Sequence, residues 1–115
     1  KSQSAAEYID VLEQRLRLRA LVADRQAPFD ALILPTVQIV APALGDLKST
    51  DKSAQINLLC LRNTAVGNFL DLPSISIPCH DQGALPVGAM LMGQSGQDRR
   101  LLSIARGLEQ ALRGH

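Results

Sequence analysis

The sequence predicts an α/β fold, with a mixed β-sheet of about three short strands flanked by helices in the order α-β-α-β-β-α. Both ends of the chain repeat apolar residues every three or four positions, which is typical of amphipathic helices. Between them lie short apolar runs bounded by proline or glycine, which are typical of strands. A content of 46% hydrophobic and 20% charged residues is ordinary for a soluble globular protein.

The first helix is predicted from Ser4 to about Arg25. Ser4 and Glu7 have the spacing of a capping box, in which both side chains bind the first free backbone N–H groups. The apolar positions of its inner face are Ile9, Leu12, Leu16 and Ala20. Because this helix and the last one are amphipathic, we expect both to cover faces of the sheet.

Three arginines, Arg15, Arg17 and Arg19, alternate along this helix. Residues two apart do not face each other on a helix. We therefore expect these arginines on a solvated surface rather than in an anion site.

The first strand is predicted at Asp30 to Pro35, an apolar run without polar alternation. Such a run indicates a strand that is covered on both faces. Residues 36–52 contain Pro42, Gly45 and a polar cluster, and are predicted to form a loop. A plain surface loop is the favoured interpretation, and a lid is the alternative.

Helical periodicity returns from Ser53 to Arg62, with Thr50 or Asp51 as the expected cap. Residues 63–71 are ambiguous because Gly67 interrupts an otherwise helical pattern.

The two remaining strands are predicted at 74–78 and 86–93, joined by turn residues at 81–83, so that they pair late in the chain. The last helix is expected from about Asp98, with Gly114 placed to end it.

Several classes of function are disfavoured by composition. A formal net charge of +1 produces no field that would gather nucleic acid, and three aromatic residues offer no stacking surface for bases. No apolar run approaches the ~20 residues of a membrane span. Cys60 and Cys79 have neither metal-site nor redox spacing, so we expect reduced thiols, no metal and a cytoplasmic location.

Four segments, taken in order, resemble the C-terminal region of the amidase-signature family. Asp30 to Thr36 is similar to its strand of apolar residues that ends in Pro-Thr. The family's next segment is similar to three stretches of this chain, namely Asn63-Thr64, Asn68 and the run from Leu72 to Pro78. Gly83 to Gly93 resembles its late strand. Asp98 to Glu109 resembles its final helix. This chain departs from the family pattern at Asp71, where a glycine is usual, and at Ala89, where a glutamine is usual.

The resemblance implies hydrolysis of carboxamides by a nucleophilic serine, a bridging serine in a cis peptide and a lysine base. A serine hydroxyl is a weak nucleophile until a neighbouring base accepts its proton. The chain has no adjacent pair of serines, and Lys1, Lys48 and Lys52 are not in the family's catalytic context. We therefore expect no catalytic residue and no cofactor here. Residues 1–115 are expected to be one C-terminal segment of a longer enzyme, inactive alone.

Other patterns that could suggest a nucleophile have plainer interpretations. Ser74 and Ser76 alternate on a predicted strand and match structural positions. The run from Gly93 to Gly96 lacks the second glycine of a nucleophile elbow and is expected to be a turn. Cys79 and His80 are adjacent on an extended segment, so their side chains should point in opposite directions.

We expect this region to form part of the pocket that binds a small-molecule amide substrate. Loops at strand ends carry specificity in α/β enzymes. The candidate substrate-binding residues are Pro35, Thr36, Val37, Asn63, Thr64 and Asn68. Asn and Thr also cap helices and close turns, so a purely structural role is the alternative for the polar ones.

Two other hypotheses stay open. The chain could derive from the A subunit of a glutamyl-tRNA amidotransferase, with protein and tRNA partners. It could also be a self-standing α/β interaction domain, which predicts satisfied strand edges and no open apolar surface. The fragment hypothesis predicts the reverse, namely self-association through surface that a missing part would cover.

Overall fold

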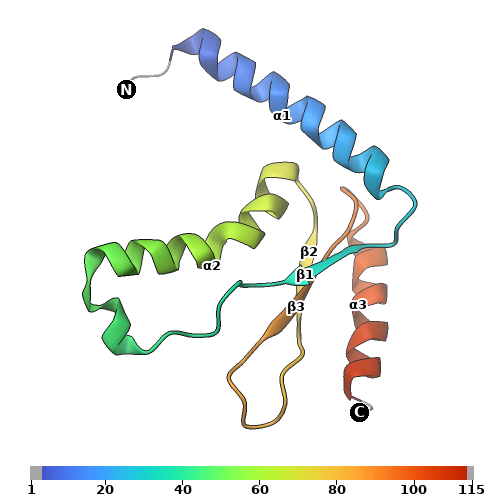
Figure 1. Ribbon diagram of the computed structural model, residues 1–115. Helices are drawn as coiled ribbons and strands as arrows, with labels where there is room; N and C mark the ends of the chain where they lie inside the picture. The colour runs from blue at the N-terminus through green and yellow to red at the C-terminus, as the bar shows by residue number, and fades with distance from the viewer. Residues whose placement is uncertain (1–3, 114–115) are drawn as a thin grey trace.

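The computed structural model describes residues 4–113, and its elements follow the predicted order (Figure 1). They are α1 (Ala5–Gln26), β1 (Leu32–Pro35), the 3-10 helix η1 (Leu44–Lys48), α2 (Thr50–Leu70), β2 (Ser74–Pro78), β3 (Gly88–Met92) and α3 (Asp98–Arg113). The α/β class is confirmed. Gly114, the expected end of α3, lies outside the described residues. None of the described helices is both long and apolar enough to cross a membrane.

The three strands form one sheet in the order β1-β3-β2. Both pairings are antiparallel rather than mixed, because β2 and β3 form a hairpin and β1 joins the other side of β3. Met90 at the centre of β3 lies opposite Leu34 of β1 and Ser76 of β2. This register brings the end of β1 close to the middle of β2, two segments far apart in sequence.

Helix α3 covers one face of the sheet, as expected. The core on this side consists of Ile77, Leu91, Leu101 and Ala105, each less than 5% exposed. Full burial of a leucine or isoleucine side chain stabilises by roughly 1.5–3 kcal/mol relative to exposure, and Ala105 adds less. This layer therefore fixes the sheet to the last helix.

Helix α2 reaches the opposite face and runs without a break to Leu70, which resolves the ambiguity over residues 63–71. Gly67 does not interrupt it, because this position lies directly against the sheet. A Cβ there would stand 2.9 Å from Ser74 Oγ and 3.6 Å from Met92 Cε. The expected caps were wrong: Ser49 is the N-cap residue and its side chain makes no capping hydrogen bond, while Thr50 and Asp51 lie in the first turn.

Helix α1 begins with the predicted capping box, in which Ser4 and Glu7 bond each other's backbone N–H groups. The expectation that α1 covers the sheet was wrong. Figure 1 shows α1 extending away from the strands, with only its C-terminal end near them. Leu16 is 59% exposed, and the end of α1 is tied to the sheet by the hydrogen bond from Gln26 Nε2 to the Met92 carbonyl, at 2.9 Å.

The arginine prediction also needs correction. Arg15 and Arg19 are four residues apart, share a helix face and both bind the Asp71 carboxylate, at 2.6 and 2.9 Å. Arg17 points elsewhere and lies 3.7 Å from Glu13. The alternating pattern means that all three arginines cannot share one helix face, but Arg15 and Arg19, which are four residues apart, can.

Strand β1 is not covered on both faces within the described residues, since only Leu34 is partly buried. The 36–52 segment is not wholly a loop either, because it holds η1 and the first residues of α2.

Candidate functional site

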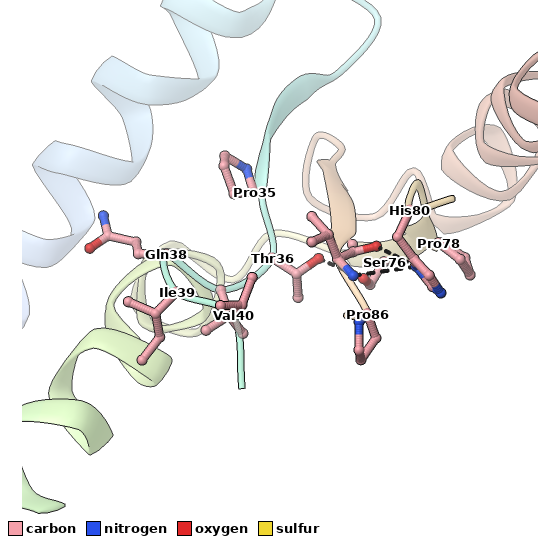
Figure 2. A pocket seen from close by; sticks show the side chains of 12 residues that line it. Pro35, Thr36, Gln38, Ile39, Val40, Ser76, Pro78, His80 and Pro86 are labelled. Atoms are coloured by element: carbon pink, nitrogen blue, oxygen red, sulfur yellow. Dashed lines mark hydrogen bonds between the residues drawn. The ribbon is translucent and has the colours of Figure 1, made fainter. Parts of the chain in front are cut away.

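An open cavity of about 460 Å³ lies where β1 ends, beside β2 and the start of β3 (Figure 2). The predicted residues Pro35, Thr36 and Val37 all line it. The other lining residues are Gln38, Ile39, Val40, Ser76, Pro78, His80, Pro86, Val87 and Gly88. Segments from three separate parts of the chain therefore meet at one concave, mainly apolar surface.

A pair of hydroxyl groups forms the polar centre of this cavity. Thr36 Oγ1 and Ser76 Oγ are 2.5 Å apart, and either can donate. The antiparallel register produces this pair, since the Thr36 N–H donates to the Gly88 carbonyl at 2.8 Å while Ser76 lies across β3 on the same face. Two hydroxyls that share one hydrogen bond keep further lone pairs and one O–H for a ligand.

Gly88 leaves the space that the hydroxyl pair needs. A Cβ at this position would collide with Ser76 Oγ and would stand 2.8 Å from Thr36 Oγ1. The glycine is required by close approach, because any side chain here would push the two hydroxyl groups apart.

His80 closes the far side of the cavity, opposite the β1 exit (Figure 2). Its Nδ1 lies 3.2 Å from the Val87 carbonyl oxygen and 3.3 Å from the Val87 nitrogen. Depending on the tautomer, the ring nitrogen donates to the first or accepts from the second. Both arrangements leave Nε2 as the second polar position of the ring.

The Cys79 and His80 side chains were expected to point in opposite directions, but both have an atom near the Val87 carbonyl oxygen. The Cys79 Sγ lies 3.6 Å from this oxygen, because the hairpin continues past β2 through the Cys79 N–H. The thiol does not line the cavity.

Asn63 supports the cavity from α2. Its Nδ2 donates to the Pro35 carbonyl at 2.7 Å, and its Oδ1 lies 3.4 Å from Gln38 Nε2. Asn63 therefore holds the exit of β1 in place and does not line the cavity itself.

Thr64 and Asn68 lie elsewhere. They line a separate cavity of about 240 Å³, between α2 and the sheet, together with Ser74 and Met90. The Thr64 hydroxyl donates to the Leu61 carbonyl within its own helix, at 3.1 Å. Four of the six predicted residues are thus brought together, and these two are not.

Within residues 4–113, the polar side chains that line the cavity include the hydroxyl groups of Thr36 and Ser76 and the imidazole of His80. No described lysine or carboxylate lines it, and the hydrogen bond of Ser76 is made with Thr36 rather than with a base. Within residues 4–113, Lys52 lies near Asp46, no group of three His, Cys, Asp or Glu side chains could hold a metal ion, and the Gly93 to Gly96 run is the expected turn before α3. The arrangement can bind and orient a ligand.

The sequence analysis weighed Ser76 and His80 only as parts of nucleophile patterns, and it named neither of them nor Gly88 as a pocket residue. The sequence did indicate that Ser74 and Ser76 share one face of β2, because alternate residues of a strand point to the same side. The strand order and register, which place that face beside Thr36, could not be read from the pattern.

Comparison with known proteins gives a consistent family. The model of the family described as Amidase matches residues 1–102. The chain is 35% identical over 114 residues to the 2-amino-5-chloromuconic acid deaminase of Comamonas testosteroni, covering 97% of this chain and 25% of the relative. It is 34% identical over 103 residues to the A subunit of the glutamyl-tRNA(Gln) amidotransferase of Halobacterium salinarum, covering 90% of this chain and 24% of the relative.

Solved structures agree. The structure of 6-aminohexanoate cyclic dimer hydrolase superposes with a TM-score of 0.77 and 27% identity, over 95% of this chain and 25% of that one. The chain spans about a quarter of the length of the relatives it matches.

Proposed function

Because this chain belongs to the amidase family, we propose that it forms the C-terminal portion of an enzyme that hydrolyses carboxamide C–N bonds, and that it supplies one wall of the substrate pocket. In this proposal the serine nucleophile, the bridging serine and the lysine base lie on polypeptide outside residues 1–115. The chain alone is inactive.

The observation that carries the proposal is the Thr36–Ser76 hydroxyl pair, placed at the centre of an apolar cavity and backed by Gly88. A carboxamide presents a carbonyl acceptor and, when primary or secondary, an N–H donor. Hydroxyl groups can serve both, while the apolar lining removes water and strengthens those hydrogen bonds. Pro35 and Val37 contribute apolar contact beside the pair, and Asn63 holds the strand exit that carries them.

The role of such a wall is to orient the substrate rather than to break its bond. A correctly positioned amide meets its nucleophile without paying the entropy of alignment at each encounter. Thr36, Ser76 and His80 are therefore expected to influence substrate binding and positioning, and not proton transfer at the scissile bond.

The experiment has two arms. The purified chain is assayed against a panel of small aliphatic and aromatic amides, with no turnover expected. The chain then replaces the matching segment of the Comamonas testosteroni deaminase, and the graft is assayed for the activity of that host. Turnover by the isolated chain, or a folded graft without activity, would contradict the proposal.

A second candidate function is a portion of an amidotransferase A subunit, since such subunits are relatives at almost the same identity as the deaminase. Transfer and hydrolysis share the amide-cleaving step. Ammonia release from glutamine by a graft into an A subunit, without activity in the deaminase graft, would favour this alternative.

The hypothesis of a self-standing interaction domain receives little support. It predicts no open apolar surface, whereas Phe29, Ile33 and Leu58 are all more than half exposed.

A further inference from the structure

His80 lines the candidate site at a distance from the hydroxyl pair. Ser76, Pro78 and His80 all line the 460 Å³ cavity, as alternate residues on one side of an extended chain do. Four residues of extended chain span roughly 13 Å. A single amide group bound at the Thr36–Ser76 pair therefore cannot also reach the His80 ring, and any group that His80 binds is a second group of the ligand.

The backbone of Val87 selects the tautomer of the His80 ring. The Val87 N–H lies 3.3 Å from His80 Nδ1 and has no other acceptor within residues 4–113. The Val87 carbonyl oxygen lies 3.2 Å from the same ring nitrogen, but it already accepts from the Cys79 N–H at 3.0 Å. The dashed lines beside His80 in Figure 2 mark both contacts of the ring. The tautomer in which Nδ1 accepts leaves both backbone groups paired, whereas the other leaves the Val87 N–H without a partner in the protein.

This tautomer carries its proton on Nε2, which is then a hydrogen-bond donor. His80 is exposed, and its Nε2 makes no hydrogen bond to the described part of the chain. None of the Lys, Arg, Asp and Glu side chains among residues 4–113 lines the cavity. A charged group placed against such a wall would lose water without gaining a counter-charge. An uncharged carbonyl oxygen is therefore the acceptor that matches Nε2–H here.

We propose that His80 is a specificity-determining residue, which donates through Nε2 to a second, uncharged carbonyl oxygen of the substrate. The substrate class is an amide that carries an ester, ketone or further amide at the other end of an apolar spacer. Pro78, Pro86 and Val87 supply the apolar surface for that spacer. The inference rests on the proposed function in taking the ligand of this wall to be the amide substrate.

Nitrogen NMR of the imidazole tests the tautomer directly. The chain holds two histidines, so His115→Gln leaves His80 as the only one. Spectra of the labelled ring are recorded in mildly alkaline buffer, where an imidazole is neutral. The proton should be found on Nε2. A proton on Nδ1 would overturn the proposal, because Nε2 would then have no hydrogen to donate.

Ligand binding to the same chain tests the specificity. Simple amides of increasing chain length are prepared in three forms, with a terminal methyl group, a methyl ester or a carboxylate. Affinities are measured from the methyl NMR signals of the cavity valines. At the chain length that fits, the ester form should bind about tenfold more tightly than the methyl form, as for one added hydrogen bond. The carboxylate form should bind no more tightly than the methyl form.

Two variants of His80 separate the hydrogen bond from packing. His80→Phe keeps a ring but has no donor, so the preference for the ester should disappear. His80→Gln retains a side-chain N–H and should keep part of it. Cys79→Ser is the matched control, since Cys79 adjoins His80 without lining the cavity, and it should leave all three affinities unchanged.

Three binding results would overturn the proposal: equal affinity for the ester and methyl forms, an ester preference that survives His80→Phe, and tightest binding of the carboxylate. A merely structural His80 would change all three affinities together. Binding needs no turnover, so the two proposals can fail separately. An inactive deaminase graft with the ester preference intact would contradict the proposed function, and an active graft without that preference would contradict the role of His80.

Discussion

The Arg15 guanidinium holds the left-handed end of helix α2 through Asp71, with Nη2 2.6 Å from the carboxylate and Nε 2.7 Å from the Phe69 carbonyl. Asp71 has φ 54° and ψ 45°, a conformation that glycine adopts without strain. The resemblance noted in the sequence implies a glycine at this position of the family pattern. In this chain an aspartate occupies the position and is bound by two arginines of α1.

Two replacements of Asp71 distinguish the cost of its left-handed backbone from the contribution of its ion pairs with Arg15 and Arg19. Asp71→Ala loses both ion pairs and keeps a side chain in the left-handed region, so it should lower the free energy of unfolding by about 1–2 kcal/mol. Asp71→Gly loses the same pairs but relieves the backbone, and should cost about 1 kcal/mol less than the alanine variant. Urea unfolding measures both.

The control for this comparison is Arg17→Ala, which removes only the exposed pair with Glu13 and should change stability by less than about 0.5 kcal/mol. Equal stability of the alanine and glycine variants would show that the left-handed backbone carries no cost.

Gly88→Ala tests the close approach at the candidate site. The new methyl group would collide with Ser76 Oγ, so we expect a loss of about 1–3 kcal/mol in unfolding free energy. Combination with Ser76→Ala removes the colliding oxygen and should recover part of that loss, which a double-mutant cycle by thermal unfolding would detect. Strict additivity would mean that the two residues do not interact.

The capping box of α1 makes the helix sensitive to acid. Hydrogen bonds from the Ser4 backbone and then its hydroxyl lower the pKa of Glu7 below its usual 4.5. A carboxyl group with a lowered folded-state pKa contributes its stability fully above the unfolded value, and loses it as the pH falls through the folded value. Helicity by circular dichroism should therefore be constant above about pH 5 and should decline below Glu7's usual 4.5.

The matched variant for this experiment is Glu7→Gln, which cannot ionise but retains an acceptor oxygen. It should remove the Glu7 part of the decline while leaving that of the other carboxyl groups. An unchanged pH profile in this variant would contradict a role for the Glu7 charge.

Local patterns predicted most elements because each depends on near neighbours. The capping box at Ser4, the apolar face of α3 and the strand bounded by Leu72-Pro73 and Pro78 all follow from residues within a turn or a strand. Position relative to the sheet does not. The amphipathic pattern of α1 indicates an apolar face but not what covers it, and here the described residues leave much of it exposed.

The candidate site divides in the same way. Pro35 ends β1 and Thr36 and Val37 follow it, so the rule that loops at strand ends form sites predicted these residues, and all three line the cavity. The strand order β1-β3-β2 places Ser76, His80 and Gly88 beside the end of β1. That order depends on pairing between segments far apart in the sequence. Thr64 and Asn68 line a different cavity, because α2 carries Asn63 toward β1 and turns the other two away from it.

The central claim is that this chain positions an amide substrate and does not break its bond, and the kinetics of Thr36→Val in the deaminase graft test it most directly. Valine keeps the shape of threonine but removes the hydroxyl bound to Ser76. We predict that KM rises by about tenfold, the equivalent of one lost hydrogen bond, with kcat changed by less than about threefold. A loss of kcat by a factor of about 1,000 at constant KM would place the Thr36 hydroxyl in the chemical step and contradict the account.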